Sequence, residues 1–370
     1  MIVFSWRQFR PQAIVGLAGL VVVAIVLAVT GPHLVSIYDT AVAACKASGG
    51  QSSACNNPVS SAYGGLRIAV TALVLVIPAL IGIFWGAPLI AHELETGTYR
   101  LAWTQSVSRL RWLLVKLGLV GLATMLAATL LSLMASWWLS PIDKANPDRF
   151  SPSSFALHGF VPGGYAVFSF ALAATVGLLM RRTLPAMAVT LVGFVAVRLG
   201  VTYWVRPHYM SPATVHLSLT QADAGFQFTG SPGASGVASV VAQAPRLPNA
   251  WVTGQDIVNR AGQAPPSALI KQACANAISA PAPVVKGTVQ SGGGGLFSGH
   301  HTSVGEVTPG VQNAVSQCFH TLSAKSYHEV VTYQPASRFW TFQTIETALF
   351  VVLALMLAGG CAWWVRHRIS

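Results

Sequence analysis

The sequence has few charged residues and almost no acidic ones. Of its 370 residues only 9% are charged, and Asp and Glu together number 10, whereas a soluble globular domain carries about 25% charged residues. Hydrophobic residues account for 53% of the chain. This shortage of charge excludes an ordinary soluble domain and indicates a membrane protein.

Motifs of catalysis and of cofactor binding are also missing. No C-x-x-C or H-x-x-x-H pair occurs, so the spacing does not suggest zinc, and the phosphate-loop pattern G-x-x-x-x-G-K-[ST] is absent. No nucleophile and base set is visible, so we expect no catalytic residue, no metal and no cofactor in this chain. The formal net charge is +12, but the basic residues lie as pairs at helix ends rather than on one face, which argues against nucleic acid as a partner.

Six long hydrophobic runs are what the sequence does contain. About 20 residues at roughly 1.5 Å rise cross the hydrocarbon core, which is about 30 Å thick. Runs of this kind lie at about 12–30, 68–90, 113–139, 157–180, 184–204 and 343–365. Helices are expected, because a spanning chain must satisfy its backbone polar groups internally. The predicted fold class is an all-α polytopic membrane protein with six transmembrane helices.

The positions of Lys and Arg predict the orientation of the spans, because cytoplasmic segments are enriched in both. With a cytoplasmic N-terminus, the inner segments carry Arg7, Arg10, Arg100, Arg109, Arg111, Lys116, Arg181, Arg182, Arg366 and Arg368. The two short outer loops then hold only Lys46, Lys144 and Arg149, with Arg67 at the border. The predicted location is the cell membrane, with several passes and both termini in the cytoplasm.

The segment 205–337 separates the first five spans (12–204) from the sixth span and its cytoplasmic tail (338–370). In the predicted orientation it is extracytoplasmic. Two stretches, 265–278 and 309–322, are typical of helices, and SYHEVVTY (326–333) is typical of a strand. We therefore expect a mixed α/β domain between helices 5 and 6.

Four of the five cysteines fall on the predicted outer side, which is the oxidising side. Pairing within each loop, Cys45 with Cys55 and Cys274 with Cys318, is the simplest of the three connectivities that four cysteines allow. Free buried thiols are the alternative. The fifth cysteine, Cys361, lies in the sixth span.

Two ionisable residues lie inside the predicted spans. Arg198 and Glu346 each lie about six residues from the outer end of their span, or roughly 9 Å at 1.5 Å per residue. A charge inside a membrane is costly and needs a partner. We therefore predict an Arg198–Glu346 pair, which could be a structural tie or a gating charge. Arg198 reaching the membrane surface by itself is the remaining possibility.

Residues 91–116 form the longest cytoplasmic loop in this topology. Residues 96–98 (Thr-Gly-Thr) carry helix stop and cap signals. The stretch YRLAWTQS (99–106) that follows is predicted to be a short helix lying along the membrane. Chemistry alone leaves open a plain charged connector held at the level of the lipid head groups by Trp103 and Trp112.

This loop resembles the loop between the second and third helices of ABC transporter permeases of the type-2 (exporter) class. The class pattern is an acid, a Gly-Thr, an apolar turn, a Ser/Thr-Arg and then a Lys, and the matching residues are Glu95, Gly97, Thr98, Ser108, Arg109 and Lys116. Residues 159–198 and 333–350 are similar to the fourth and fifth helices and to the entry to the last helix of actinobacterial members. The resemblance covers nearly all of the membrane part and little of residues 205–337.

The resemblance implies the six-helix fold of type V ABC exporters, in a permease that is not itself an enzyme. In that class the loop after the second helix is a coupling helix that docks on a separate ATPase subunit. That role falls on residues 96–108, within a coupling loop of 91–112. Leu101 and Trp103 would be its apolar anchors, with Arg100 and Arg109 at a polar rim.

The resemblance also implies the partners. Two copies of an ABC ATPase would bind ATP and Mg²⁺, and a second permease chain, identical or related, would complete the pathway in the lipid bilayer. Residues 1–11 would be an interfacial helix on the inner leaflet. Two other functions stay open: a membrane sensor or immunity component whose ATPase partner signals, and an ion-gradient-driven transporter, which would need more ionisable residues within its spans.

Overall fold

The structure is a computed structural model. It describes residues 2–48, 63–96, 109–145, 149–219, 226–229, 239–242, 250–275 and 309–368. The chain forms two compact units, one made of Met1–Met210 with Ser337–Ser370 and the other of Ser211–Ala336. The first is called the bundle below, and the second is called the inserted unit.

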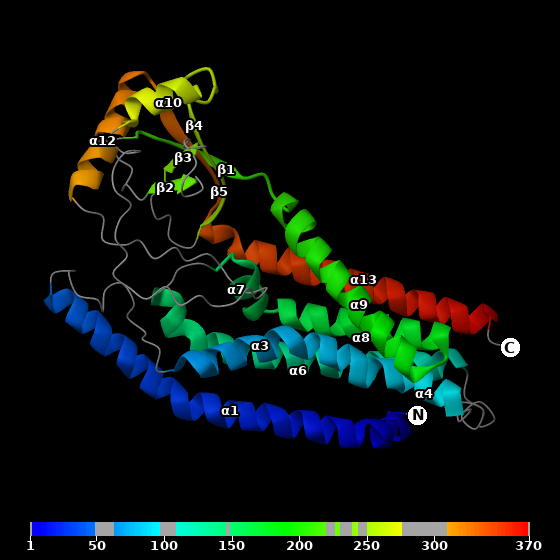
Figure 1. The fold of residues 1–370 in the computed structure, drawn as a ribbon. Helices are drawn as coiled ribbons and strands as arrows, with labels where there is room; N and C mark the ends of the chain where they lie inside the picture. Colours follow the sequence, from blue (N-terminus) through cyan, green and yellow to red (C-terminus); the bar gives the residue numbers. More distant parts are fainter. Residues whose placement is uncertain are drawn as a thin grey trace. The chain divides into compact units, whose positions relative to one another are not determined.

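The bundle confirms the predicted fold class. Within the described ranges, six helical runs are long and apolar enough to cross a membrane (Figure 1). They are Arg10–Ala47, Gly64–His92, Leu110–Lys144, Val161–Met180, Thr183–His208 and Ala336–His367. Each contains or largely overlaps one of the six predicted spans. The small sheet and the disulfide come between the fifth and the sixth span in the sequence.

Several of these runs are built from more than one helical element. In chain order the elements are α1 (Ile2–Ala47), α3 (Gly64–Ile81), η2 (Gly82–Gly86), α4 (Ala87–Thr96), α6 (Arg109–Ala145), α7 (Pro152–Leu157), α8 (Val161–Met180), α9 (Thr183–Gly200), η3 (Val201–Val205), η4 (Arg206–His208), η5 (Ala336–Arg338) and α13 (Phe339–Arg368). Elements η2 and η3 are π-helical. The end of the bundle where α4 ends and α6 begins is called the loop end, and the end where α13 begins is called the insertion end.

Helix α1 is longer than the sequence predicts. It runs for 46 residues without a break and contains Pro11 and Pro32, so residues 2–11 of the predicted N-terminal segment continue directly into the first span. A proline removes only one hydrogen bond from the helix, and a spanning helix can tolerate that loss. At about 1.5 Å per residue, α1 is roughly 70 Å long, about twice what a bilayer core needs.

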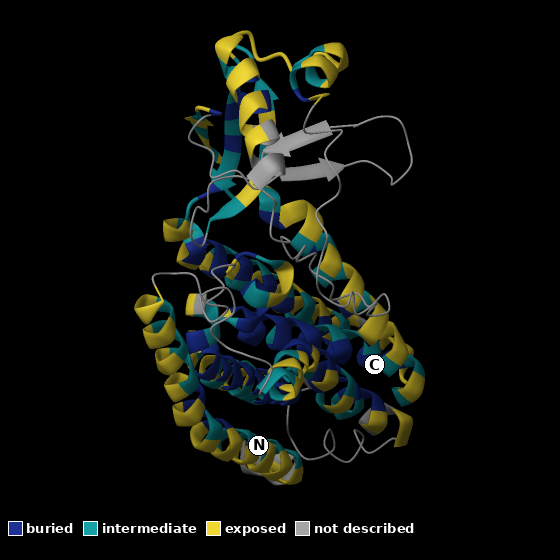
Figure 2. Cartoon of the chain, turned by 60° about the vertical axis from the view of Figure 1, so that its left-hand side comes forward, coloured by how far each residue is buried: buried dark blue, intermediate teal, exposed yellow. Residues whose placement is uncertain are grey.

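Helix α8 is the centre of the bundle. It packs against α3, η2, α4, α6, α9 and α13, and buried residues concentrate around it (Figure 2). Small residues permit this close packing, as is usual where helices associate in lipid. A Cβ atom added at Gly86 would lie 2.6 Å from the Cβ of Ala173 and 2.9 Å from the carbonyl oxygen of Phe170. Gly86 therefore sets how closely η2 can approach α8.

The Gly86→Ala variant should lose stability, because the added methyl group meets backbone of α8 that cannot move aside locally. Overpacking of this kind costs about 1–3 kcal/mol. Gly118→Ala is the matched control, since Gly118 lies within a span and has no neighbouring atom that an added Cβ would meet. Thermal unfolding of both variants in the same detergent checks this, and equal midpoints would contradict it.

The inserted unit contains a three-stranded antiparallel sheet in the order β1-β5-β4. Its strands are β1 (Ala213–Leu217), β5 (His328–Gln334) and β4 (Trp251–Val258), and a separate pair is formed by β2 (Phe226–Thr229) and β3 (Ser239–Ala242). Only β5 was expected from the sequence. Strands β1 and β4 are its two neighbours, so the predicted strand is the middle one of the sheet.

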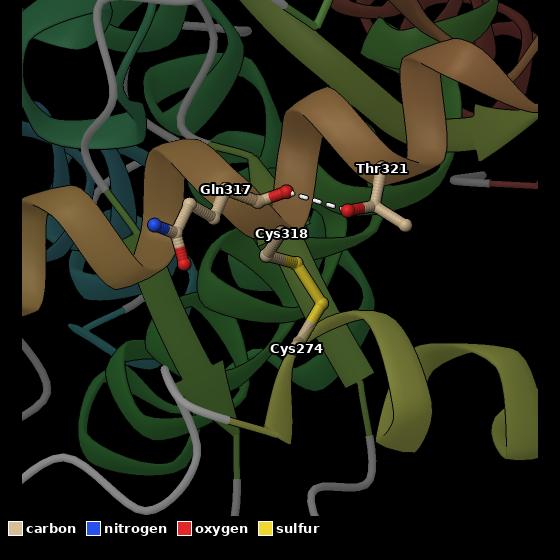
Figure 3. The surroundings of a disulfide bond; sticks show 4 residues. All are labelled: Cys274, Gln317, Cys318 and Thr321. Carbon is tan, nitrogen blue, oxygen red and sulfur yellow. Dashed lines mark hydrogen bonds between the residues drawn. A yellow bond between two sulfur atoms is a disulfide. The ribbon is translucent and has the colours of Figure 1, made fainter.

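Two helices complete the described part of the inserted unit and carry its disulfide. They are α10 (Ser267–Ala273) and α12 (Pro309–Ala324), which agree with the two helical stretches expected from the sequence. Cys274, directly after α10, is bonded to Cys318 of α12 (Figure 3). Both cysteines are buried with Leu219, Phe319 and Leu322. This pairing is confirmed, whereas Cys55 lies outside the described residues and its pairing with Cys45 stays a prediction.

One face of the sheet is more deeply buried than the other. Along β5, Glu329 and Val331 are buried while the alternate residues His328 and Val330 are partly exposed. Glu329 accepts a hydrogen bond from the side chain of Gln255 at 3.4 Å, and burial raises the pKa of this carboxyl above its ordinary value. One face of the sheet is therefore buried, while the face that carries His328 and Val330 is partly exposed to solvent.

Removing the disulfide should destabilise the inserted unit selectively. Cys274 and Cys318 are 44 residues apart, and closing a loop of that length stabilises a fold by roughly 2–5 kcal/mol. The Cys274→Ser/Cys318→Ser variant should therefore be cut by protease within residues 211–336 at a lower temperature than the parent. Cys361→Ser is the control, because Cys361 is a free buried cysteine of the bundle. Equal protection of the parent and the double variant would contradict the prediction.

Candidate functional site

A buried ion pair lies at the insertion end of the bundle. Arg206, in η4, donates from Nε to Oε2 and from Nη2 to Oε1 of Glu346 in α13, each at 2.8 Å. The two side chains are only 1% and 0% exposed. Two parallel hydrogen bonds between charged groups are the strongest arrangement available to an Arg and a carboxylate. The pair therefore joins the end of the fifth span firmly to the sixth.

Three aromatic residues surround this ion pair. Tyr165 of α8 donates its hydroxyl hydrogen to Oε1 of Glu346, and Tyr209 donates to Oε2 at 3.3 Å. The guanidinium of Arg206 also lies over the ring of Phe155, 4.1 Å from its centroid. A buried ion pair stabilises a fold only where further hydrogen bonds satisfy its remaining atoms. Both carboxylate oxygens of Glu346 are satisfied here, and the group ties α8, η4 and α13 together.

The predicted pair of Arg198 with Glu346 is wrong. Arg198 donates from Nη1 to the backbone carbonyl of Leu75 in α3 at 2.9 Å, and its guanidinium lies 4.8 Å from the centroid of the Tyr165 ring. Arg198 lies within the fifth run, as predicted, but its partner is different. Glu346 is already bonded to Arg206, which comes from further along the same run.

Arg206 lies beyond the end of the fifth span that the sequence predicts. The expected span ends at residue 204, and the residue before a proline, here Pro207, is disfavoured in a helix. In the structure the run continues through the π-helical turn η3 into η4 and ends at His208. Residues eight positions apart lie near the same helix face. The guanidinium of Arg198 lies over the Tyr165 ring, and that of Arg206 donates to the Tyr165 hydroxyl at 3.5 Å.

The contact of Arg198 with Leu75 lies next to a proline in the second span. Pro78 is inside α3, and a proline displaces carbonyl groups of the preceding turn. A carbonyl displaced in this way can accept a hydrogen bond from a neighbouring helix, which is how spanning helices tolerate proline. The π-helical element η2 follows four residues later. Arg198 therefore fixes the second span to the fifth just before an irregular stretch.

A second contact joins these two spans at the loop end. The carboxylate of Glu95, in the last turn of α4, accepts hydrogen bonds from the hydroxyl and the backbone N–H of Thr183, at 2.8 and 3.2 Å. Thr183 begins α9, so Glu95 satisfies a backbone group that the start of a helix leaves without an internal partner. These two hydrogen bonds lower the pKa of Glu95 below its ordinary value. The α3–η2–α4 run is thus bonded to α9 at two points, one on each side of η2.

Most of the predicted docking residues lie outside the described part of the chain. These are Gly97, Thr98, Arg100, Leu101, Trp103 and Ser108. Arg109 begins α6, but its side chain is not described. Lys116, which completes the pattern, is 1% exposed, and its Nζ lies 4.8 Å from the centroid of the Trp112 ring. Of the predicted docking set, only Glu95 has described contacts, and they lie at the corner next to the loop.

Comparison with known proteins gives one match. The family described as ABC-2 membrane transporter related matches residues 17–206, which is just over half of the chain. The matched region runs from within α1 to Arg206 and includes the loop between α4 and α6. No curated protein and no solved structure matches the chain.

A double-mutant cycle separates the observed ion pair from the predicted one. Arg206→Ala and Glu346→Ala should each cost about 3–5 kcal/mol, because each leaves a buried charge without its partner. The double variant should cost clearly less than the sum of the two. Arg198→Ala combined with Glu346→Ala is the control and should be closer to additive. Denaturant unfolding in detergent checks both cycles, and a larger coupling energy for Arg198 would contradict the assignment.

Proposed function

This chain belongs to the ABC-2 membrane transporter related family, and from that membership we propose that it is the membrane-spanning permease subunit of an ATP-driven exporter. The family match is the observation that carries the proposal, because it covers the loop between α4 and α6 and both spans that flank it. Members of the family are typically not catalytic. ATP and Mg²⁺ would bind a separate ABC ATPase, present in two copies, and a second permease chain would complete the pathway.

The loop between α4 and α6 would receive the motion of the ATPase. An ATPase that closes on ATP moves as a rigid body, and a short docked segment passes such motion on as a shift between two states. Because Glu95 bonds the end of α4 to the start of α9, a displacement of the loop would move both helices together. This contact supports a coupled movement of the second and fifth spans.

The bend that such a movement needs would lie in the second span. Pro78 and the π-helix Gly82–Gly86 interrupt its regular helix, and interruptions of this kind are where helices bend. Arg198 holds the Leu75 carbonyl on the far side of the interruption. We therefore expect α4 and the start of α9 to pivot together about the Arg198–Leu75 contact, while the Arg206–Glu346 pair keeps the fifth and sixth spans together.

The proposed orientation places both termini in the cytoplasm. Ala13, near the start of α1, packs on the same hydrophobic cluster as Trp112 at the start of α6 and Val365 near the end of α13. Both ends of the chain's membrane part therefore lie at the loop end, where the Arg residues concentrate. The Cys274–Cys318 disulfide supports an oxidising, extracytoplasmic location for residues 211–336.

Co-purification tests the proposed function. We expect the full chain, expressed with a candidate ABC ATPase and placed in lipid vesicles, to hold that ATPase and to raise its rate of ATP hydrolysis. Failure of both would remove the proposal. Stable association and hydrolysis without export of any offered amphiphilic compound would favour a sensor whose ATPase partner signals.

The Trp103→Ala variant should weaken the association with the ATPase without removing the chain from the membrane. A buried Trp anchor at an interface is commonly worth about 2 kcal/mol or more, so we expect about 30-fold weaker binding. Trp204→Ala is the matched control, because Trp204 is an exposed Trp of the bundle at the insertion end. Binding to the immobilised ATPase measures both variants, and an equal effect of the two changes would exclude Trp103 as the anchor.

A further inference from the structure

Two histidines meet on the partly exposed face of the three-stranded sheet. His216 of β1 lies opposite Val330 of β5, and His328 is two residues before Val330 on the same strand. Residues opposite each other, and residues two apart on one strand, point to the same face. Their imidazole rings are 5.2 Å apart between centroids and are inclined by 43°.

We propose that His216 and His328 form a two-histidine site for a first-row transition-metal cation such as Zn²⁺. Neutral imidazole is a preferred ligand of Zn²⁺, Cu²⁺ and Ni²⁺. Within the described ranges, neither ring has a hydrogen-bond partner, so ring nitrogens are available to bind a cation.

The separation of the rings suits one shared tetrahedral ion. A Zn–N bond is about 2.0–2.1 Å, and a ring nitrogen lies roughly 1.1 Å from the ring centre, so two imidazoles on one tetrahedral ion have centroids about 5.2 Å apart. The observed distance has this value. An aromatic contact alone permits any separation between about 4.5 and 7 Å. The distance fits both kinds of contact.

The site is an open one. No third His, Cys, Asp or Glu joins the pair to make a metal-binding group among the described residues. Water would complete the coordination, as it does at sites that have fewer protein ligands than the ion needs. We therefore expect each chain to bind one metal ion at this pair, with modest affinity.

Metal binding would clamp β1 to β5. Strand β1 follows the α9–η3–η4 run in the chain, and β5 precedes α13, so these are the two strands by which the chain enters and leaves the inserted unit. A ligand that binds only the folded state raises its stability by RT ln(1 + c/Kd), where c is the free metal concentration, so the effect grows with that concentration. This role does not depend on whether the chain exports anything.

Calorimetric titration of the full chain with ZnCl₂ tests the site. The protein would carry an affinity tag without histidine, be stripped of metal with a chelator, and be held in lipid nanodiscs. The parent should bind one more Zn²⁺ than His216→Gln or His328→Gln does. His320→Gln is the matched control, because His320 is an exposed histidine of α12 in the same unit, and it should bind as the parent does.

A spectroscopic measurement tests the two ligands directly. With Cu²⁺ as the probe, electron paramagnetic resonance should show two nitrogen ligands in the parent and one in either variant. If His328→Gln does not fold, His216→Gln decides, since His216 is exposed on an outer strand. Unchanged Zn²⁺ stoichiometry and affinity in His216→Gln would overturn the proposal.

Discussion

A carboxylate buried among apolar helices has to be neutralised where it lies, and the bundle meets this requirement at Glu346. Arg206 supplies the opposite charge through two hydrogen bonds, and the hydroxyls of Tyr165 and Tyr209 occupy the remaining positions on the carboxylate. These partners come from α8, from η4 and from the residue that follows η4. Because a lone buried charge is very costly, the relative positions of α8, η4 and α13 cannot change without breaking the group.

Close packing around α8 is the second constraint. Lipid is as apolar as the helix surfaces, so helices in a membrane associate through tight contacts and hydrogen bonds rather than through the hydrophobic effect. Gly86 permits such a contact between η2 and α8, and Cys361 of α13 donates a hydrogen bond to the hydroxyl of Thr175 in α8 at 3.2 Å. Against this fixed centre, the second span has an irregular middle and is bonded to the fifth at Leu75 and at Glu95. The second span therefore has two regular helices, α3 and α4, with the irregular stretch where it can bend between them.

Much of the fold followed from sequence patterns, and the failures have identifiable causes. The six spans were predictable because a hydrophobic run of sufficient length has few alternatives to a helix in a membrane. The position of Arg198 within the fifth span was predictable from the hydrophobic run, but its partner was not. A π-helical turn and a proline altered where the run ends, and they brought Arg206 to Glu346 instead. Strands β1 and β4 were missed because short strands depend on their neighbours more than on their own composition.

The sequence by itself determined the membrane class, the number of spans and the helices α10 and α12, because hydrophobic length and helix periodicity are properties of the chain alone. Only the tertiary structure decided which groups meet: Arg206 with Glu346, Arg198 with the Leu75 carbonyl, Glu95 with Thr183, and His216 with His328. Partners of this kind depend on the phase of each helix and on the register of each strand. A single irregular turn or a shift of one residue changes the partner while leaving the sequence pattern almost the same.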